Sequence, residues 1–361
     1  MGKKNKKEVK VPKVTKLPKV TLCTPTFNRR PFIPMMLKCF DHQNYPKDNI
    51  EWLIVDDGTD KIEDLVLHIP QIKYFKFDEK MTLGKKRNFL NDKATGDIII
   101  FIDDDDYYPP ERISHAVKTL TNSKALCAGS SEMFIYFKHI SKMYKFGPYG
   151  PNHATAATFA FKRELLLQTR FDDNSSLAEE KKFLKDYTVP FVQLDPKQSI
   201  LVFSHIHNSF DKKELLKTMP NPTIHETTVV PTDLIKNKDL LNFFIDDIDN
   251  LLEFYEPGNP SNKPDVLKQM EEIKATREIM MNAQTKEQQY NQNKINSIIA
   301  ANPQVPKDKE NQTNLIIRYL LGENKTLTEK TDHLNAKIKE LITEKIKERT
   351  TEKERTTEKT Q

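Results

Sequence analysis

The apolar run Ile98-Ile99-Ile100-Phe101-Ile102 ends on four aspartates, Asp103 to Asp106, and constrains the fold more than any other segment. The pair Gly96-Asp97 precedes it and predicts a turn, and a short β-branched run of this kind is typical of a fully buried strand. A helix is disfavoured, because Pro109 and Pro110 would end it within two turns. The segment therefore predicts a central strand with carboxylates at its carboxyl end.

The clustered carboxylates indicate a binding site at that edge of the sheet, where open α/β sheets place their ligands. Carboxylates packed side by side repel one another unless they share a cation, and oxygen ligands suit Mg²⁺, Mn²⁺ or Ca²⁺. The alternative is an acidic turn that caps the following helix. The position directly after a buried strand favours the cation site.

Two earlier segments have the same design. Residues 20–29 predict a strand followed by a turn that opens a helix, and residues 52–59 predict another strand, with Asp56, Asp57 and the turn residue Gly58 at its end. Each strand is followed by a segment compatible with a helix, so the first hundred residues predict the order β-α-β-α-β. We therefore expect an α/β fold with a mainly parallel central sheet flanked by helices.

Four motifs in this region resemble those of the family 2 glycosyltransferases with the A-type, nucleotide-sugar-binding fold: Pro25-Thr26-Phe27-Asn28-Arg29, Val55-Asp56-Asp57-Gly58-Thr59, Leu83-Gly84-Lys85-Lys86-Arg87-Asn88, and the segment from Gly96-Asp97-Ile98 through Pro109. They occur in the family's order between residues 20 and 110. The resemblance implies transfer of a sugar from a nucleotide sugar to an acceptor hydroxyl, with inversion. It also implies a divalent metal cofactor, Mn²⁺ or Mg²⁺.

The resemblance assigns roles to the strand-end residues. Asp105 would bind the metal, with Asp103 or Asp104 holding the ribose or the ion, and the metal would neutralise the leaving diphosphate. Lys86 and Arg87 would add positive charge at the phosphates. The base pocket would favour a UDP sugar, because Asp57 would accept a hydrogen bond from the imide N–H of uracil. The other side of that pocket would come from Thr24, Pro25 and Thr26.

The acceptor side carries the expected catalytic base. Glu179-Glu180 stands where the family has Glu-Asp before a helix, and the second acid of that pair is the base. Glu180 replaces the usual Asp, and its longer side chain leaves the assignment open between Glu180 and Glu179. The alternative is that both acids only favour the start of a helix through its dipole.

A histidine near the end of the catalytic domain completes the metal shell in many A-type enzymes. Two follow the apolar run from Ile200 to Phe203, and His205 and His207 would share one face of a continued strand. We predict His207 as the metal ligand, with a purely structural histidine as the alternative.

Composition divides the chain into four parts. Residues 1–18 form a basic arm, with eight lysines in the first nineteen residues, and we expect it to be disordered. Residues 19–212 are the expected catalytic domain, and residues 213–300 a helical extension. Residues 301–361 are expected to form an amphipathic helix that runs into a low-complexity tail. The second half of the chain is therefore predicted to be mainly α-helical.

The expected location is cytoplasmic. The three cysteines contain no CxxC pair, which fits a reducing compartment, and neither a signal peptide nor a transmembrane segment is expected. The basic arm could contact an anionic membrane peripherally, but a solubilising tail is the favoured interpretation. The net charge of +5 resides largely in this arm, and no nucleic-acid partner is expected.

The C-terminal part carries a short heptad pattern. Leu320, Leu327, Leu334 and Leu341 recur every seven residues, with Ile317, Asn324, Thr331 and Ile338 three residues before them. A polar residue at such positions is typical of parallel dimers. Gly322 weakens the pattern, so a homodimer through this helix and a monomeric amphipathic helix both remain open.

Two other functions compete with a glycosyltransferase. A haloacid-dehalogenase-type phosphotransferase is disfavoured, because Val55 occupies the position of the nucleophilic acid in its Asp-x-Asp-Gly-Thr loop. A catalytically degenerate scaffold that binds nucleotide sugars and assembles through its helical half stays as the alternative, on account of Glu180. The expected partners are a nucleotide-sugar donor and an acceptor that is a glycan, a protein or a small molecule.

Overall fold

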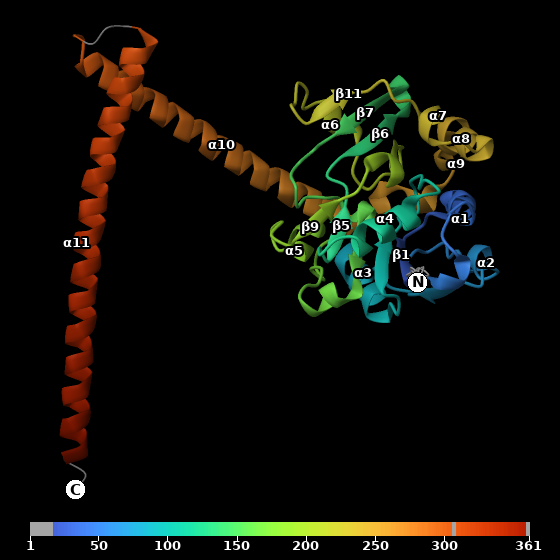
Figure 1. The fold of residues 1–361 in the computed structure, drawn as a ribbon, viewed down its shortest axis with the longest axis horizontal. Helices are drawn as coiled ribbons and strands as arrows, with labels where there is room; N and C mark the ends of the chain where they lie inside the picture. Colours follow the sequence, from blue (N-terminus) through green and yellow to red (C-terminus); the bar gives the residue numbers. More distant parts are fainter. Residues whose placement is uncertain (1–16, 305–307, 359–361) are drawn as a thin grey trace, which may run out of the picture. The chain divides into compact units, whose positions relative to one another are not determined.

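The computed structural model describes residues 17–304 and 308–358 (Figure 1). Its contacts divide the chain into two units, one ending at Glu272 and one beginning at Ile273. The expected basic arm lies almost entirely outside the described residues, as does Pro306. Within the described part, no helix combines the length and the apolar character needed to cross a membrane.

A seven-stranded sheet forms the centre of the first unit, in the order β3-β2-β1-β4-β8-β5-β9. Strands β1, β2, β3 and β4 are mutually parallel, whereas β8 is antiparallel to both of its neighbours. The strands are β1 (Val20–Thr26), β2 (Ile50–Asp56), β3 (Ile72–Lys76), β4 (Ile98–Phe101), β5 (Cys127–Gly129), β8 (Ala160–Lys162) and β9 (Phe191–Gln193). The predicted mainly parallel α/β sheet is confirmed.

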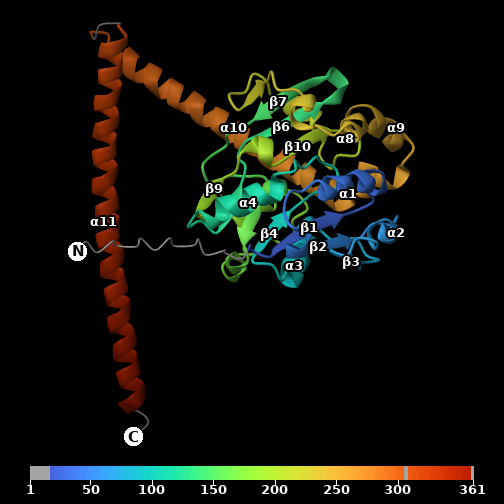
Figure 2. The ribbon, with the colours of Figure 1, turned by 45° about the vertical axis from the view of Figure 1, so that its right-hand side comes forward.

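Helices cover both faces of this sheet (Figure 2). Side chains alternate along the central strands, so that Ile98 and Ile100 of β4 join one apolar cluster and Ile99 and Phe101 join another. The first cluster includes residues of α1 (Ile33–Asp41), α2 (Glu63–Val66) and α4 (Arg112–Thr121), and the second includes Leu90 of α3 (Leu83–Lys93). Burial on both faces explains why the strands read as continuous apolar runs.

A second sheet extends this unit beyond the parallel core. Its order is β10-β6-β7-β11, and a bridge between Tyr107 and Leu201 joins it to the segment after β4. The strands are β6 (Met133–Phe137), β7 (Lys142–Phe146), β10 (Leu201–Ser204) and β11 (Ile224–Glu226). The apolar run from Ile200 to Phe203 lies largely in β10.

The first unit continues well past the expected domain boundary at residue 212. The reason is a third apolar cluster, in which Phe243 and Phe244 pack with Phe203 of β10 and Phe32. This part of the expected helical extension consists of three pieces, α8 (Lys238–Asn242), a π-helical segment (Phe243–Asp247) and α9 (Ile248–Glu253). These pieces cover the second sheet and belong to the first unit.

The remaining helices of the first unit are short, apart from α10. The α-helices are α5 (Glu180–Phe183), α6 (Lys213–Leu216) and α7 (Pro231–Leu234). The 3-10 turns are Arg30–Phe32, Lys47–Asn49, Lys138–Ile140, Ala156–Thr158, Arg163–Leu167, Pro196–Gln198, Glu256–Gly258 and Pro260–Asn262. The last two fall where the proline- and glycine-containing break after Tyr255 is predicted.

Two long helices account for the end of the chain. Helix α10 (Pro264–Ala301) begins in the first unit and ends in the second, and α11 (Lys309–Glu358) follows. Both were expected from the sequence, including the break around Pro303. The heptad residues Leu327, Leu334 and Leu341 of α11 are more than half exposed.

Candidate active site

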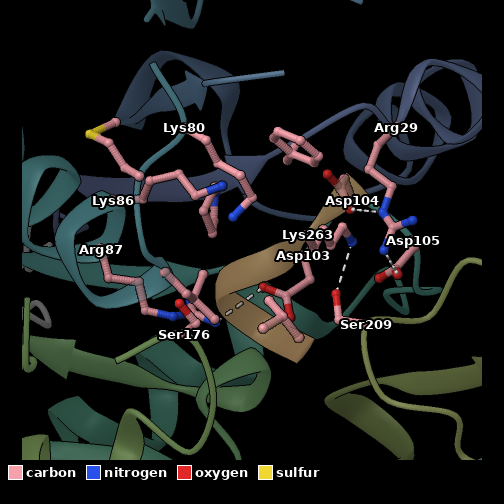
Figure 3. Close-up of a pocket in the computed structure, with 15 residues that line it drawn as sticks. Arg29, Lys80, Lys86, Arg87, Asp103, Asp104, Asp105, Ser176, Ser209 and Lys263 are labelled. Atoms are coloured by element: carbon pink, nitrogen blue, oxygen red, sulfur yellow. Dashed lines mark hydrogen bonds and ion pairs between the residues drawn. The ribbon is translucent and has the colours of Figure 1, made fainter. Parts of the chain in front are cut away.

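A cavity of about 150 Å³ lies at the carboxyl ends of β1 and β4 (Figure 3). Its lining combines three aspartates with several basic side chains, and residues far along the chain close it. The lining residues are Pro25, Phe27, Arg29, Lys80, Met81, Leu83, Lys86, Arg87, Asp103, Asp104, Asp105, Ser176, Ser209, Lys263 and Val266. Of the residues predicted to bind the nucleotide sugar, Pro25, Lys86, Arg87, Asp103 and Asp104 line this cavity, and so does the predicted metal ligand Asp105.

The four consecutive aspartates have different partners. Asp103 lies 3.5 Å from Nη2 of Arg87, whereas Asp104 and Asp105 lie 3.5 and 3.2 Å from the Arg29 guanidinium. Asp106 turns away and accepts a 3.3 Å hydrogen bond from the backbone N–H of Phe203. Asp103, Asp104 and Asp105 therefore line the cavity, whereas Asp106 binds the backbone of the second sheet.

Arg29 is the residue that holds Asp104 and Asp105 together. Its Nη1 donates to the carbonyl oxygen of His207 at 2.8 Å, and its guanidinium lies 5.6 Å from the ring centroid of Phe32. Burial raises the pKa of Asp104, whereas Asp105 has a lowered pKa because Arg29 and His205 outweigh its burial. Arg29 was part of the sequence motif, but its role was not predicted.

Asp57 is fully paired within the protein. It accepts a 2.8 Å hydrogen bond from Nζ of Lys86 and a 2.6 Å hydrogen bond from the backbone N–H of Met81. Lys86 also reaches the carbonyl oxygen of Thr26 at 3.3 Å. The hydroxyl of Thr24 donates to the carbonyl of Ile102 and accepts from the Trp52 indole, so Thr24 ties β1 to its neighbours.

The loop that carries Glu179 and Glu180 is fastened to helix α3. Gly84 makes the approach possible, because a Cβ there would lie 1.8 Å from the carbonyl oxygen of Asp172. Asn88 then accepts from the N–H of Phe171 and donates to its carbonyl, both at 3.0 Å. The glycine and the asparagine of this motif thus place the acidic pair beside the cavity.

The two glutamates lie in different surroundings. Glu179 is buried and accepts a 2.8 Å hydrogen bond from Nε of Arg87, which links it to Asp103. Glu180 begins α5, where burial, together with the charge of Glu179, raises its pKa to about 7. A carboxylate with a pKa near neutrality is suited to proton transfer at neutral pH.

His205, rather than the predicted His207, lies against the acidic cluster. Nε2 of His205 is 3.3 Å from Oδ2 of Asp105, and burial lowers the pKa of this imidazole to about 3. His207 faces Tyr255, with ring centroids 6.1 Å apart, and contributes its carbonyl oxygen to Arg29. His205 and His207 do not share one face as predicted, because the strand β10 ends at Ser204 and the chain turns.

The oxygen atoms around the cavity fit a hard divalent cation. Over residues 17–304 and 308–358, no three His, Cys, Asp or Glu side chains already form a cluster that could hold a metal. Mg²⁺ is usually held by one or two carboxylates, with substrate phosphates and water completing its shell. Oδ1 of Asp103 accepts no hydrogen bond from the described residues, and Asp105 faces the same cavity. These two carboxylates, with the neutral His205, are the candidate ligands.

One side of the cavity comes from the segment between α9 and α10. Lys263 is 5% exposed, and burial together with the nearby Arg29 lowers its pKa. Its Nζ donates to Oγ of Ser209 at 2.9 Å (Figure 3). No sequence motif distinguishes Lys263 from the other lysines of this basic chain.

The family of the central domain follows from a direct comparison. The family model described as "Glycosyl transferase family 2" matches residues 21–174. These residues form a glycosyltransferase family 2 domain. The matched segment contains Asp57 and Asp103 to Asp105, whereas Glu179, Glu180 and Lys263 lie beyond it.

Two curated relatives resemble shorter parts of the chain. The poly(ribitol-phosphate) beta-N-acetylglucosaminyltransferase TarS of Staphylococcus aureus is 30% identical over 103 residues, which are 27% of this chain and 18% of TarS. A GalNAc(5)-diNAcBac-PP-undecaprenol beta-1,3-glucosyltransferase of Campylobacter jejuni is 32% identical over 111 residues, 29% of this chain and 34% of that enzyme. The chain thus spans about a third or less of the length of these relatives.

Solved structures of similar proteins cover about half of the chain. A crystal structure of Staphylococcus aureus TarS is 20% identical and covers 52% of this chain and 60% of its own, with a TM-score of 0.43. The mannosyltransferase PcManGT from Pyrobaculum calidifontis, in complex with GDP-Man and Mn²⁺, is also 20% identical, covers 52% and 57%, and has a TM-score of 0.42.

Proposed function

We propose that the chain is an inverting, metal-dependent glycosyltransferase that transfers a sugar from a UDP sugar to an acceptor hydroxyl. The observation that carries this proposal is the cavity at the strand ends, where Asp103, Asp104 and Asp105 meet the side chains of Arg29 and Arg87. Such a site matches a ligand that carries both a diphosphate and a divalent cation. The family 2 domain supports the same reaction class.

The basic side chains account for the leaving group. Departure of a nucleoside diphosphate develops negative charge, which preorganised cations stabilise in a site shielded from water. Lys86 and Arg87 line the cavity and are buried, so that water does not compete for their side chains. A divalent ion bound at Asp105 would add charge neutralisation at the phosphates.

The preference for uridine rests on Asp57. Its carboxylate is held in place by Met81 and Lys86 at the end of β2. A carboxylate accepts a hydrogen bond from the imide N–H of uracil, whereas cytosine presents an unprotonated nitrogen at that position. Lys86 would have to share Asp57 with the base, which the two lone-pair regions of each oxygen allow.

The acceptor reaction is assigned to the acidic pair. Glu180 removes the proton of the acceptor hydroxyl while that oxygen attacks the anomeric carbon from the face opposite the diphosphate. Glu179 orients Arg87 through its 2.8 Å hydrogen bond. The names of both curated relatives specify a beta linkage, the product that inversion of an α-linked nucleotide sugar would give.

A donor screen tests the proposal. The purified full-length chain is incubated with a panel of nucleoside diphosphate sugars, with Mn²⁺, with Mg²⁺ or with excess chelator, and free nucleoside diphosphate is measured. We expect slow release of UDP from one UDP sugar only when metal is present, since water can replace the acceptor. Binding of a donor without release of nucleoside diphosphate would favour the scaffold instead, and absence of both binding and release for every donor would overturn both functions.

A further inference from the structure

The segment that leads into α10 is fastened to the rest of the first unit at both of its ends. On one side, the Tyr255 hydroxyl donates to Asp60 at 2.8 Å and the Asn28 amide donates to the carbonyl of Pro257 at 2.8 Å. On the other side, Asp265 accepts from the Ser176 hydroxyl at 2.6 Å and from Lys80 at 2.5 Å. The segment is thus a fixed wall of the cavity.

Lys263 lies between these two attachments as a buried cation. Its one hydrogen-bond partner is the neutral hydroxyl of Ser209, and within the described part of the chain no carboxylate oxygen lies within 4.0 Å of its Nζ. The nearest carboxylates of the cavity, Asp104 and Asp105, are already bound by Arg29.

An unpaired cation in such a place points to an anionic ligand. Removing an ammonium group from water costs several kcal/mol unless an opposite charge compensates it. The other cations of the cavity have carboxylate partners: Arg29 has Asp104 and Asp105, Arg87 has Glu179 and Asp103, Lys80 has Asp265, and Lys86 has Asp57. Lys263 alone among the cavity's lysines and arginines lacks one within the described residues.

We propose that Lys263 binds the diphosphate of the donor, so that the segment before α10 is a working part of the donor site. This inference rests on the proposed function and goes beyond it, because it assigns a diphosphate ligand outside the family 2 domain of residues 21–174. The ammonium group donates to phosphate oxygens in the bound state, with Ser209 keeping its orientation. The negative charge of the donor's phosphates thereby neutralises the ammonium group of Lys263.

Calorimetry with UDP and with uridine, in the presence of Mn²⁺, tests this role in the full-length chain. Lys263→Met keeps the length of the side chain and removes its charge. We expect it to weaken UDP binding roughly 10- to 100-fold, the usual range for a charged hydrogen bond. Uridine carries no phosphate, so its affinity should stay unchanged. Lys263→Arg should recover part of the UDP affinity.

A matched control and a folding check accompany the variant. Lys268→Met removes an exposed lysine from the adjoining helix α10, 80% accessible at its side chain, and should leave UDP affinity unchanged. Without ligand, Lys263→Met should melt at the same temperature as the wild type or higher, because it removes a buried charge. If it unfolds, Lys263→Gln replaces it in the same measurements.

The outcomes separate the two proposals. Equal UDP affinity in Lys263→Met and wild type would overturn the diphosphate role alone, and so would an equal loss for UDP and uridine. Tighter UDP binding in the variant would make Lys263 a group that blocks the cavity, which also overturns this role. If the wild type binds no nucleoside diphosphate, the proposed function itself fails and this inference fails with it.

Discussion

The adjacent residues Glu179 and Glu180 differ in their partners and therefore in the roles that they can play in the reaction. Glu179 is committed to Arg87, whereas Glu180 has a pKa raised to about 7 by burial and by the charge of Glu179. Glu180→Gln should therefore lower sugar transfer by roughly 10²- to 10⁴-fold, because an amide cannot accept the proton. UDP affinity should barely change. Glu179→Gln is the matched control, and a greater loss of transfer there would move the base one residue back.

The same assignment predicts the pH dependence. Below about pH 7 Glu180 is mostly protonated and cannot act as a base, so kcat/KM should rise as the pH rises through about 7. A profile measured in the wild type should show this limb, and Glu180→Gln should lack it. An identical limb in the variant would assign the titration to another group.

Asp105 is the carboxylate on which metal dependence is expected to rest. Asp105→Asn keeps the size of the side chain but removes the charge that a divalent cation needs. We expect turnover to fall by at least about 10²-fold, and the melting temperature to fall as well, because Arg29 and His205 stabilise the charged form of Asp105. Asp92→Asn, an exposed aspartate paired with Arg170, serves as the control. Full turnover of Asp105→Asn, or of the wild type in excess chelator, would contradict the metal site.

Nucleotide choice is tested at Asp57. Asp57→Ala should weaken UDP binding by about 1–3 kcal/mol, the usual cost of an unpaired buried donor. The structure adds a rival cause, because the same change also releases Lys86. Comparing UDP with CDP by calorimetry separates them: base recognition predicts a loss for UDP only, whereas displacement of Lys86 predicts similar losses for both.

At the scale of secondary structure, the sequence predicted best those elements whose burial is uniform. The strands β1, β2 and β4 are buried on both faces, and their apolar runs end in polar residues that mark the site. Residues 155–162 show where this reasoning stops. These residues are mostly apolar or β-branched, yet Ala156–Thr158 is a 3-10 turn and only Ala160–Lys162 pairs with β4. Three-residue strands such as β5 and β9 have no periodicity to detect.

Helix α11 carries the prediction for assembly. Its heptad leucines are exposed in the single chain, and a parallel two-stranded coiled coil would bury them. We expect light scattering to give twice the 42.1 kDa mass of one chain. Leu327→Glu combined with Leu334→Glu should return the mass to that of a monomer. Thr326→Glu with His333→Glu, on the neighbouring positions, should not. A monomeric wild type would leave α11 as an amphipathic helix.

At the scale of the whole chain, the catalytic unit is larger than its motifs suggest. Phe243 and Phe244 cover Phe203 of β10, and the ring of Phe203 stacks on Phe244 at 4.4 Å. A chain ending at residue 212 should therefore lack a cooperative melt, because it exposes this cluster. A chain ending at residue 272 should melt cooperatively, as followed by circular dichroism. Equal behaviour of the two would show that the later helices are dispensable.

The extent of this unit was hidden from sequence reasoning for a physical reason. The motifs predict the ends of parallel strands, since each lies next to its own strand in the chain. Lys263 and the apolar cluster reach the site through tertiary packing, which leaves no local signature. His205 was noted, but the turn after Ser204 decides which imidazole meets Asp105.

The ion pairs of Arg29 with Asp104 and Asp105 have a thermodynamic consequence. A cation that binds Asp105 must displace one arm of Arg29, and a free guanidinium then needs an anion nearby. The metal would free the Arg29 guanidinium to bind the diphosphate. The diphosphate would in turn neutralise the guanidinium that the metal displaces. Their binding free energies are therefore coupled, and by linkage the factor by which metal tightens the nucleotide equals the factor by which the nucleotide tightens the metal. Under the proposed function, the site would bind metal and diphosphate as a pair and would bind either ion alone weakly.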